Sequence, residues 1–583
     1  MIPRVVTCCS GPHRPLGRVA WTLAAPGGVG AAVAVAGLLA AAAAGAEVVA
    51  VEVAHTPWAA APACSGRFVR HELPHATLMD GDPPLMFDGN GAGVALADLD
   101  GDGLVDIALA GLRAPVTLLW NRGGLRFERV EMAAEATRAI NALDLDGDGA
   151  MDLVVTRSGR RPQWWRGVGE RSFAAVPDDA DFISWFPIYA MAWADLDGDL
   201  DLDLVGASYD AELDKLRLRE VYLNFAAGTD TRTPLDGGVF YYENTGARLR
   251  SFPLARQAQA LAIALLDLDH DGRRDILVGN DYDTPDYVYL NTEFGWRLGQ
   301  PFVHTTFNTM GYAEGDVDND GTVELLAADM QPYREGADVD AAWAPLWSGQ
   351  RPEQGDEVQI VANVLQVRAA DGRYVNRAPE RGLAATGWTW SVQFGDLDHD
   401  GLLDVYAVNG MVGTVFEHLP GAELIEENQA LRNAGAAGFV PAPEWGLAAT
   451  EGGRGMAMAD LDLDGDLDLV VNNVAAPSVL FENQVCGAAA GALGTSVEID
   501  LRWPGSPNPR AVGALLQLAT ATASYLREVR VAGGYLSSEP ARVHFGLPAD
   551  PGPLTLTVTW PDGATSTIPG IEPGHLLTIQ RPT

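Results

Sequence analysis

The sequence predicts an all-β protein: a seven-bladed β-propeller over residues 80–485, followed by a small antiparallel β-sandwich over residues 490–583. Three observations lead to this fold class. A nine-residue Asp-rich motif occurs seven times, with starts 46 to 80 residues apart (98 to 144, and 316 to 396). Each copy precedes a short apolar run typical of a buried strand. Four-stranded units repeated around an axis form a propeller.

The first copy of the motif lies in "ADLDGDGLVD", which runs from Ala97 to Asp106. Its alternating carboxylates can converge on one point, and gathered carboxylates suit a hard cation such as calcium. Gly101 and Gly103 allow the positive φ angles that a tight loop requires. We expect ligands from the side chains at positions one, three, five and nine, and from the carbonyl at seven. An EF-hand is excluded, because it requires Glu at position twelve and this chain has Leu109 there.

The seven copies, numbered here loop 1 to loop 7, predict up to seven structural Ca²⁺ ions. Each ion would offset the repulsion among neighbouring carboxylates. The predicted metal ligands are Asp98, Asp100, Asp102 and Asp106; Asp144, Asp146, Asp148 and Asp152; Asp195, Asp197, Asp199 and Asp203; Asp267, Asp269, Asp271 and Asp275; Asp316, Asp318, Asp320 and Glu324; Asp396, Asp398, Asp400 and Asp404; and Asp460, Asp462, Asp464 and Asp468.

The residue type at the fourth position of each loop tests whether the backbone there can adopt the left-handed conformation. Gly, Asn and His are the residue types most often found in the left-handed region, and they fill this position in the first six loops. We therefore expect His270 and His399 to be turn residues and not catalysts. Leu463 breaks the pattern, so we expect loop 7 to curl differently. Loop 5 closes with the longer Glu324, which predicts a weaker or water-bridged site.

The segments between loops carry further strand signals, often an apolar or aromatic pair before Asn, as in "TLLWNRGG" and "VFYYENTG". The longest intervals predict insertions after loops 3 and 5. These insertions hold "KLRLREVYLN" (Lys215 to Asn224) and "WAPLWSGQRPEQ" (Trp343 to Gln354). Their aromatic and basic residues suit either a partner surface or packing between blades, and the sequence leaves both possibilities open.

Composition and the N-terminus indicate export. The formal net charge of -39 excludes nucleic acid as a partner, because phosphate binding needs basic patches. Basic residues precede an Ala-rich run at about 29–44, and Ala44-Gly45-Ala46 fits a signal-peptidase site. We predict a signal peptide at 1–46 and an N-terminal linker at 47–79, with an uncleaved anchor as the alternative. No later segment predicts a membrane span, so the mature protein is expected to be secreted or in the cell envelope, extracellular or periplasmic.

The C-terminal region has a different pattern. "SVEIDLRW", "GALLQLAT", "LREVRVA", "RVHFGL" and "LTLTVTW" alternate polar with apolar residues or are rich in β-branched residues. Turns rich in Gly and Pro separate them, which predicts the antiparallel sandwich. His544 lies within one of these strand patterns, and we expect it to be a hydrogen-bonded packing residue.

The motifs resemble those of known families. The Asp units followed by an apolar strand look like the FG-GAP or VCBS repeats of integrin α-subunit propellers and bacterial surface proteins. "NTMGYAEGDVDNDGTVELLAADM" and "GWTWSVQFGDLDHDGLLDVYAVNG" resemble the cartilage acidic protein family, whose members end in an ASPIC/UnbV domain. The C-terminal "REVRVAGGYLSSEPARVHFGLP" agrees with that domain. The resemblance does not imply an enzymatic activity.

Function is therefore expected to lie in binding. The sequence has no H-E-x-x-H, no phosphate-binding G-x-x-x-x-G-K and no G-x-S-x-G. We predict a secreted calcium-binding propeller that is an extracellular recognition or adhesion module for a protein or glycan partner, and not an enzyme. The alternative is a polysaccharide-active lyase or hydrolase on a calcium-stabilised propeller, because paired acids suited to glycoside cleavage are abundant.

Two cysteines remain after removal of the signal peptide, Cys64 and Cys486. They bracket the propeller, and a closed propeller brings the two ends of its chain together. We therefore predict a Cys64–Cys486 disulfide in an oxidising compartment. Two alternatives stay open: Cys64 as a lipoprotein cysteine, and two unrelated free thiols.

Overall fold

The computed structural model describes residues 47–58, 64–79, 86–169, 171–177, 187–215, 237–246, 248–282, 284–347, 358–411, 424–485 and 494–582. These residues belong to one compact unit, Glu47–Thr583. The predicted signal peptide at 1–46 lies outside the described residues. So do Cys486 and most of the two insertion segments singled out above.

Each of the seven Asp loops joins two strands of a separate antiparallel sheet, called here the first and second strands, and each sheet takes the number of its loop. Sheets 1 to 4 are β3 (Val94–Ala97), β4 (Asp106–Leu109), β5 (Val116–Asn121), β6 (Phe127–Met132); β7 (Thr137–Leu143), β8 (Asp152–Arg157), β9 (Arg160–Gly167), β10 (Phe173–Ala175); β11 (Ala190–Ala194), β12 (Asp203–Ala207), β13 (Val239–Asn244), β14 (Leu249–Ala255); and β15 (Ala260–Leu266), β16 (Asp275–Asn280), β17 (Tyr287–Thr292), β18 (Gly295–Leu298).

Sheets 5 to 7 follow the same plan with additions at their edges. They are β20 (Gly311–Gly315), β21 (Glu324–Ala328), β24 (Val364–Arg368), β25 (Tyr374–Asn376); β22 (Met330–Gln331), β26 (Gly387–Gly395), β27 (Asp404–Asn409), β28 (Gln429–Asn433), β29 (Phe439–Pro441); and β30 (Gly453–Ala459), β31 (Asp468–Asn473), β32 (Pro477–Glu482), β2 (Val69–Ala76). The short strands β19 (Thr305–Thr306) and β23 (Gln359–Ile360) pair in parallel.

The loop motif sets the start of each second strand. In every sheet the ninth loop residue is the first residue of the second strand, as Asp106 is for β4 and Glu324 for β21. The apolar run that follows is buried along its whole length in β4, β8, β12, β16, β21, β27 and β31. A strand buried on both faces lies between two other layers, as the strands of a propeller blade do.

Successive sheets pack against one another through apolar side chains. First strands contact each other in the pairs β3–β7, β11–β15, β15–β20, β20–β26, β26–β30 and β30–β3. Between sheets 5 and 6, for example, Leu326 and Val392 share one buried cluster. Between sheets 7 and 1, Leu96 and Val470 share another. The contact of the first sheet with the last makes the fold β-propeller-like.

Asparagine side chains link neighbouring sheets in a repeated way. Asn121, at the end of β5, donates from Nδ2 to the carbonyl oxygen of Leu461 in loop 7 at 2.6 Å. The equivalent donors are Asn291 to Leu196 O (2.7 Å), Asn433 to Val317 O (2.8 Å), Asn483 to Leu397 O (3.0 Å) and the Tyr374 hydroxyl to Leu268 O (3.1 Å). Each acceptor is the second residue of the preceding loop, so these bonds run from sheet to sheet and join sheet 1 to sheet 7.

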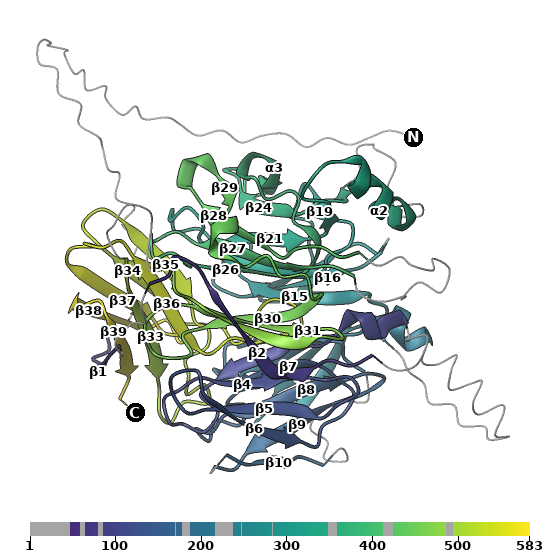
Figure 1. The fold of residues 1–583 in the computed structure, drawn as a ribbon. Coiled ribbons are helices and arrows are strands. Elements are labelled where there is room, and N and C mark those ends of the chain that lie inside the picture. The colour runs from purple at the N-terminus through teal and green to yellow at the C-terminus, as the bar shows by residue number, and fades with distance from the viewer. Residues whose placement is uncertain are drawn as a thin grey trace, which may run out of the picture. The chain divides into compact units, whose positions relative to one another are not determined.

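The segment 47–79, which the sequence predicts to be a linker, contains two paired strands. β2 pairs with β32 and supplies the outer strand of sheet 7. β1 (Glu52–Pro57) pairs with β39 (His575–Gln580) in the C-terminal module. β2 lies next to β32 at the edge of sheet 7 opposite β30, and Figure 1 shows β1 beside β39. The N-terminal segment therefore belongs to both parts of the fold.

The C-terminal module consists of two four-stranded sheets. One is β1, β39, β33 (Thr495–Arg502) and β36 (Arg542–Leu547); the other is β35 (Ser524–Glu528), β34 (Leu515–Ala519), β37 (Leu554–Thr559) and β38 (Thr565–Ile571). The predicted sandwich is purely antiparallel, whereas β33 pairs with β39 in parallel. That difference arises because β39 lies between β33 and the N-terminal β1, an arrangement that a local strand pattern does not encode.

Helical structure is sparse. The helical elements include η1 (Met86–Asn90), α2 (Ala337–Trp347), α3 (Ala378–Arg381), η2 (Gly435–Ala437) and η3 (Pro443–Trp445). α2 belongs to the insertion after loop 5. Its Trp343 is 2% exposed, and the centroid of its ring lies 6.2 Å from that of Trp388. Trp343 therefore packs against the fold. Across the described part of the chain, no helix has the length and apolar character needed to cross a bilayer.

The sheet-to-sheet asparagines should contribute strongly to stability. Asn433 is 0% exposed and donates to Val317 O and Leu403 O. Asn433→Ala leaves buried carbonyl groups unsatisfied and should lower the free energy of unfolding by about 2–4 kcal/mol. Gln429→Ala is the matched control, because Gln429 lies on the same strand and bonds only to nearby backbone at Glu427 and Asn428. Denaturant titration should show a change within about 0.5 kcal/mol for the control. Equal losses would contradict the sheet-linking role.

The disulfide prediction can be tested directly. Cys64 is disulfide-bonded, and the adjacent Ser65 donates its backbone N–H to Gln484 O at 3.1 Å. Cys486 is two residues beyond Gln484 but outside the described residues, so its role stays a prediction. Peptide mapping of the unreduced mature protein should yield one linked peptide containing Cys64 and Cys486. Cys64→Ser should then destabilise the fold by roughly 4–5 kcal/mol, because the closed chain is long. Detection of either cysteine as a free thiol would contradict the pairing.

Candidate metal centres

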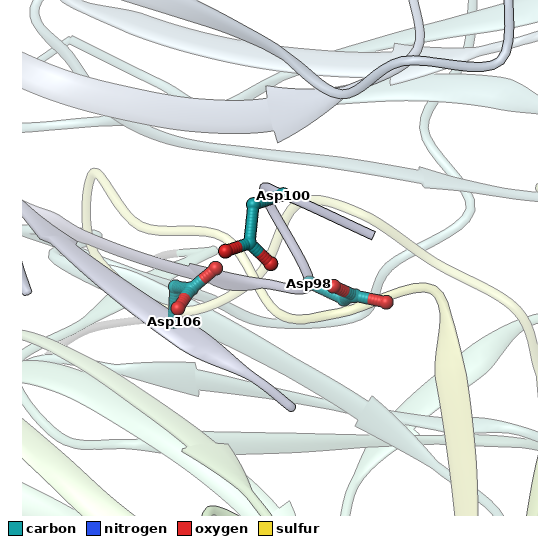
Figure 2. A group of neighbouring side chains, drawn as sticks. All are labelled: Asp98, Asp100 and Asp106. Atoms are coloured by element: carbon teal, nitrogen blue, oxygen red, sulfur yellow. The ribbon is translucent and has the colours of Figure 1, made fainter. Parts of the chain in front are cut away.

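The carboxylates of loop 1 converge. Asp98 follows β3 directly, Asp106 opens β4, and Asp100 lies between them in the loop. One oxygen of each lies within 4.8 Å of the others, and Figure 2 shows the three side chains grouped together, with the carboxylates of Asp100 and Asp106 facing each other. At that separation two unit charges repel by about 3–4 kcal/mol at an effective dielectric of 20.

Loops 2 to 5 bring together the carboxylates at positions one, three and five. These groups are Asp144, Asp146 and Asp148; Asp195, Asp197 and Asp199; Asp267, Asp269 and Asp271; and Asp316, Asp318 and Asp320. Loop 1 differs, because its group includes the ninth residue and omits Asp102. Asp102 instead lies 3.4 Å from the guanidinium of Arg171, which also pairs with Asp100.

Two hydrogen bonds recur in all seven loops and fix their shape. The backbone N–H at position two donates to the ninth carboxylate at 2.9–3.2 Å. The N–H at position six donates to the first carboxylate at 2.8–3.1 Å. The first and ninth carboxylates therefore each use one oxygen to hold the loop.

In six sheets the second oxygen of the ninth carboxylate binds the third strand. It accepts the backbone N–H of Asn121, Gly167, Asn244, Asn291, Asn433 or Asn483 at 2.7–2.8 Å. Gly167 replaces Asn because a Cβ there would lie 2.3 Å from the Met151 carbonyl oxygen. The Asn in the strand signals "TLLWN" and "VFYYEN" is thus a link between loop and strand, a role that the strand signal does not indicate by itself.

All seven loops have the same backbone curl. The fourth residue has φ between 56° and 86° in every loop, and the sixth between 77° and 95°. His270 and His399 are at φ 62° and 56°, as expected for turn residues. The expectation that Leu463 makes loop 7 curl differently is wrong, because Leu463 is at φ 60°. The two shared hydrogen bonds impose the left-handed conformation on Leu463, as they do on Leu200 in loop 3.

Buried oxygens without a partner show that a cation fits these loops. Asp98 Oδ1, Asp144 Oδ1 and Asp398 Oδ1 are buried and make no hydrogen bond. An ionised oxygen removed from water is costly unless a donor or a metal ion compensates it. Carboxylate oxygens are the ligands that hard divalent cations prefer. The orphaned oxygens belong to positions one and three, where the predicted ligands are.

Two further carboxylates were missed by the sequence reasoning. Asp201 and Asp466 occupy position seven of loops 3 and 7, and each has a buried Oδ1 without a partner. From the sequence, only a backbone carbonyl is expected as a ligand at position seven. The signal was present, because "DLDGDLDLD" and "DLDLDGDLD" continue the alternation of Asp through that position.

Burial makes the loop carboxylates hard to ionise without a cation. It is the main cause that raises the pKa of the ninth residues, and other carboxylates of the same loop add to the rise while backbone donors oppose it. The pKa is about 7 for Asp106 and Asp152, about 8 for Asp203 and Glu324, and about 6 for Asp275. These values lie well above those of exposed carboxyl groups.

Loop 5 keeps the shared geometry despite its longer closing residue. Glu324 Oε2 accepts the Val317 N–H at 3.0 Å, which is the same bond that Asp makes elsewhere. The weaker or water-bridged site expected for loop 5 stays a prediction. His544 is a packing residue: its Nε2 lies 3.1 Å from Gly465 O, and burial lowers its pKa to about 3.

Two protein families match parts of this chain. Residues 496–583 match the family described as ASPIC and UnbV. Residues 98–155, 144–206 and 267–327 match FG-GAP-like repeats. The chain therefore carries FG-GAP-like repeats and a C-terminal ASPIC and UnbV domain. The matched repeats include loops 1 to 5, and loops 6 and 7 share their φ angles and hydrogen bonds. The chain matches none of the curated proteins with which it was compared.

Solved structures show weaker likenesses. BBS1N in complex with ARL6DN aligns over 73% of this chain and 97% of its own when soaked with mercury (10% identity, TM-score 0.39), and over 71% and 96% when soaked with lead (9%, 0.37). Sqt1 of Saccharomyces cerevisiae aligns over 75% of this chain and 99% of its own (9%, 0.36). With TM-scores below 0.5, these likenesses carry no conclusion about fold or function.

The raised pKa values predict how pH affects the metal-free protein. The folded state binds more protons than the unfolded chain at pH values between about 4 and 8, because burial raises the pKa of the loop carboxyls to about 6–8. The free energy of unfolding should therefore fall as pH rises from 5 to 8. A bound cation offsets this loss, so the increase in melting temperature on adding CaCl₂ should be larger at pH 8 than at pH 5. An increase that is equal at both pH values, or larger at pH 5, would contradict the assignment.

Proposed function

We propose that this protein is a calcium-stabilised, seven-bladed β-propeller that acts outside the cytoplasm as a recognition or adhesion module for a protein or glycan. The observation that carries the proposal is the set of buried, unpartnered carboxylate oxygens in loops of one repeated geometry. In an exported protein, calcium is the hard cation suited to such loops. The ions would be structural, because the loops lie between strands of the fold.

The seven-bladed arrangement is supported by contacts between successive first strands and by the bond from Asn121 to Leu461. The predicted signal peptide and the disulfide at Cys64 support export to an oxidising compartment. The mature protein is thus proposed to be secreted or to reside in the cell envelope.

A cavity on the loop-bearing side supports a recognition role. It has a volume of about 880 Å³ and lies between loops 3 and 4 and the C-terminal module. Its lining includes Tyr241, Trp296 and Trp560 together with Arg273. The neighbouring Phe294 is 91% exposed in the turn between β17 and β18. Concave, aromatic-lined surfaces of this size are where ligands bind most often. No feature of the described residues favours turnover of a polysaccharide over its binding.

Metal content tests the calcium assignment. Asp146→Ala should remove one calcium ion per chain, measured by elemental analysis after dialysis against low free calcium. The fold should remain, because each sheet has its own loop and only one of the seven loops is changed. Glu131→Ala is the control, because this exposed residue of β6 pairs only with a surface arginine. A protein that retains no calcium, or an Asp146→Ala variant with unchanged content, would contradict the assignment.

Binding and turnover assays then separate the two functional classes. With calcium present, the protein should bind members of a glycan array or a panel of extracellular proteins. Phe294→Ala should weaken that binding, whereas Val168→Ala, a change at another exposed apolar residue, should not. Cleavage of any member of a polysaccharide panel, lost on mutation outside the Asp loops, would replace the recognition proposal by the enzymatic alternative.

A further inference from the structure

The C-terminal module packs directly on the Asp loops. His544 and Ser496 of the module both bond to the carbonyl oxygen of Gly465 in loop 7. Arg542 donates to the carbonyl oxygen of Gly103 in loop 1 at 2.9 Å. These two glycines occupy position six of their loops, with φ 95° and 94°. The module therefore binds carbonyl groups whose direction depends on the curl of the loop.

Loops 6 and 2 meet the module at equivalent positions. The ring of His399, at position four of loop 6, lies 5.4 Å from that of His544. A Cβ at Gly401, position six, would lie 3.0 Å from the Tyr525 ring. A Cβ at Gly147, position four of loop 2, would lie 3.2 Å from Pro507 O. All of these contacts fall on the left-handed residues that turn the carboxylates toward one another.

The module also inserts the turn "GGYLSS" (residues 533–538) among the first strands of the sheets. Ser538 exchanges backbone hydrogen bonds with β3: its N–H donates to Val94 O at 2.9 Å, and its carbonyl accepts from Leu96 N at 3.1 Å. Leu536 O accepts the N–H of Ile140 in β7 at 3.2 Å. Tyr535 is 0% exposed, and its hydroxyl donates to Asn90 O at 3.0 Å.

The balance of buried charges connects the docking of the module with cation binding in the loops. The side chain of Arg542 is 5% exposed and lies 3.8 Å from Asp98 of loop 1 and 3.9 Å from Glu498 of its own module. Glu498, 2% exposed, is close enough to Asp460 of loop 7 for the two carboxylates to repel each other. Docking therefore buries more acidic than basic groups in this region, and positive charge in the loops would offset the excess.

We infer that the loop-bearing face is a calcium-dependent docking surface for the chain's own C-terminal module. Ions in loops 1, 6 and 7 hold the carbonyl groups and the charge balance that the module requires. Loss of these ions releases the module and withdraws residues 533–538 from the first strands. This inference rests on the proposed calcium binding and assigns it a second role. Because coupling is reciprocal, the docked module raises the calcium affinity of the loops that it contacts.

Hydrogen exchange of the mature, full-length protein tests this inference. The reporters are the amides of Tyr535, Ser538, Leu96 and Ile140, all of which bond across the docking surface. Chelation with EGTA should speed their exchange at least 10-fold. Amides that pair β34 with β37 inside the module should keep their protection. Calcium content is measured on the same samples, so failure of calcium binding is distinguishable from failure of the coupling.

Paired loop variants make the test specific. Asp398→Asn, in loop 6, should lose one calcium ion and speed exchange at Tyr535 and Ser538. Asp197→Asn should also lose one ion but leave these amides protected, because loop 3 faces the cavity and a Cβ at its Gly198 would meet nothing within 4 Å. Protected amides in β8 show that each variant is folded. Calcium loss without faster exchange in Asp398→Asn, or equal effects of both variants, would overturn the inference; absence of calcium from the wild type would overturn both proposals.

Discussion

The repulsion between carboxylates gathered in each Asp loop is the constraint on which the rest of the structure depends. The first and ninth carboxylates hold the loop through backbone N–H groups, and the strand that follows starts at the ninth. The same ninth carboxylate binds the third strand in six sheets. The loop, the second strand and the third strand are thus organised around carboxylates. The protein supplies hydrogen-bond donors to only some of the oxygens of these groups. The proposed cation in each loop would complete this arrangement and neutralise charge that burial makes costly.

Hydrogen bonds from Asn side chains connect several of these loops to the next sheet. An Asn on the third strand uses its N–H for its own loop and its side chain for the preceding loop, as Asn433 does with Asp404 and Val317. A disturbance in one loop therefore reaches the next sheet through a buried hydrogen bond. The C-terminal module contacts the same loops at Gly103 and Gly465. It is placed where it responds to the geometry of several loops at once.

Much of this organisation could be predicted from the sequence, because it is local. The loops, the strands that follow them and the turn role of His270 depend on residues a few positions apart. The curl at Leu463 was mispredicted, because shared hydrogen bonds outweigh the intrinsic preference of Leu. The pairing of β2 with β32, and of β1 with β39, joins residues more than 400 positions apart, and no local pattern specifies such a pairing. Docking of the module was not foreseen for the same reason.

The most direct test of the central claim is the anomalous scattering of calcium in crystals grown with CaCl₂. The account predicts anomalous difference peaks among the carboxylates of the Asp loops, including the point between Asp98, Asp100 and Asp106 shown in Figure 2. These peaks should lie about 2.3–2.6 Å from the coordinating oxygens. Well-ordered loops without such peaks, at calcium concentrations in the millimolar range, would contradict the claim that the loops exist to hold cations.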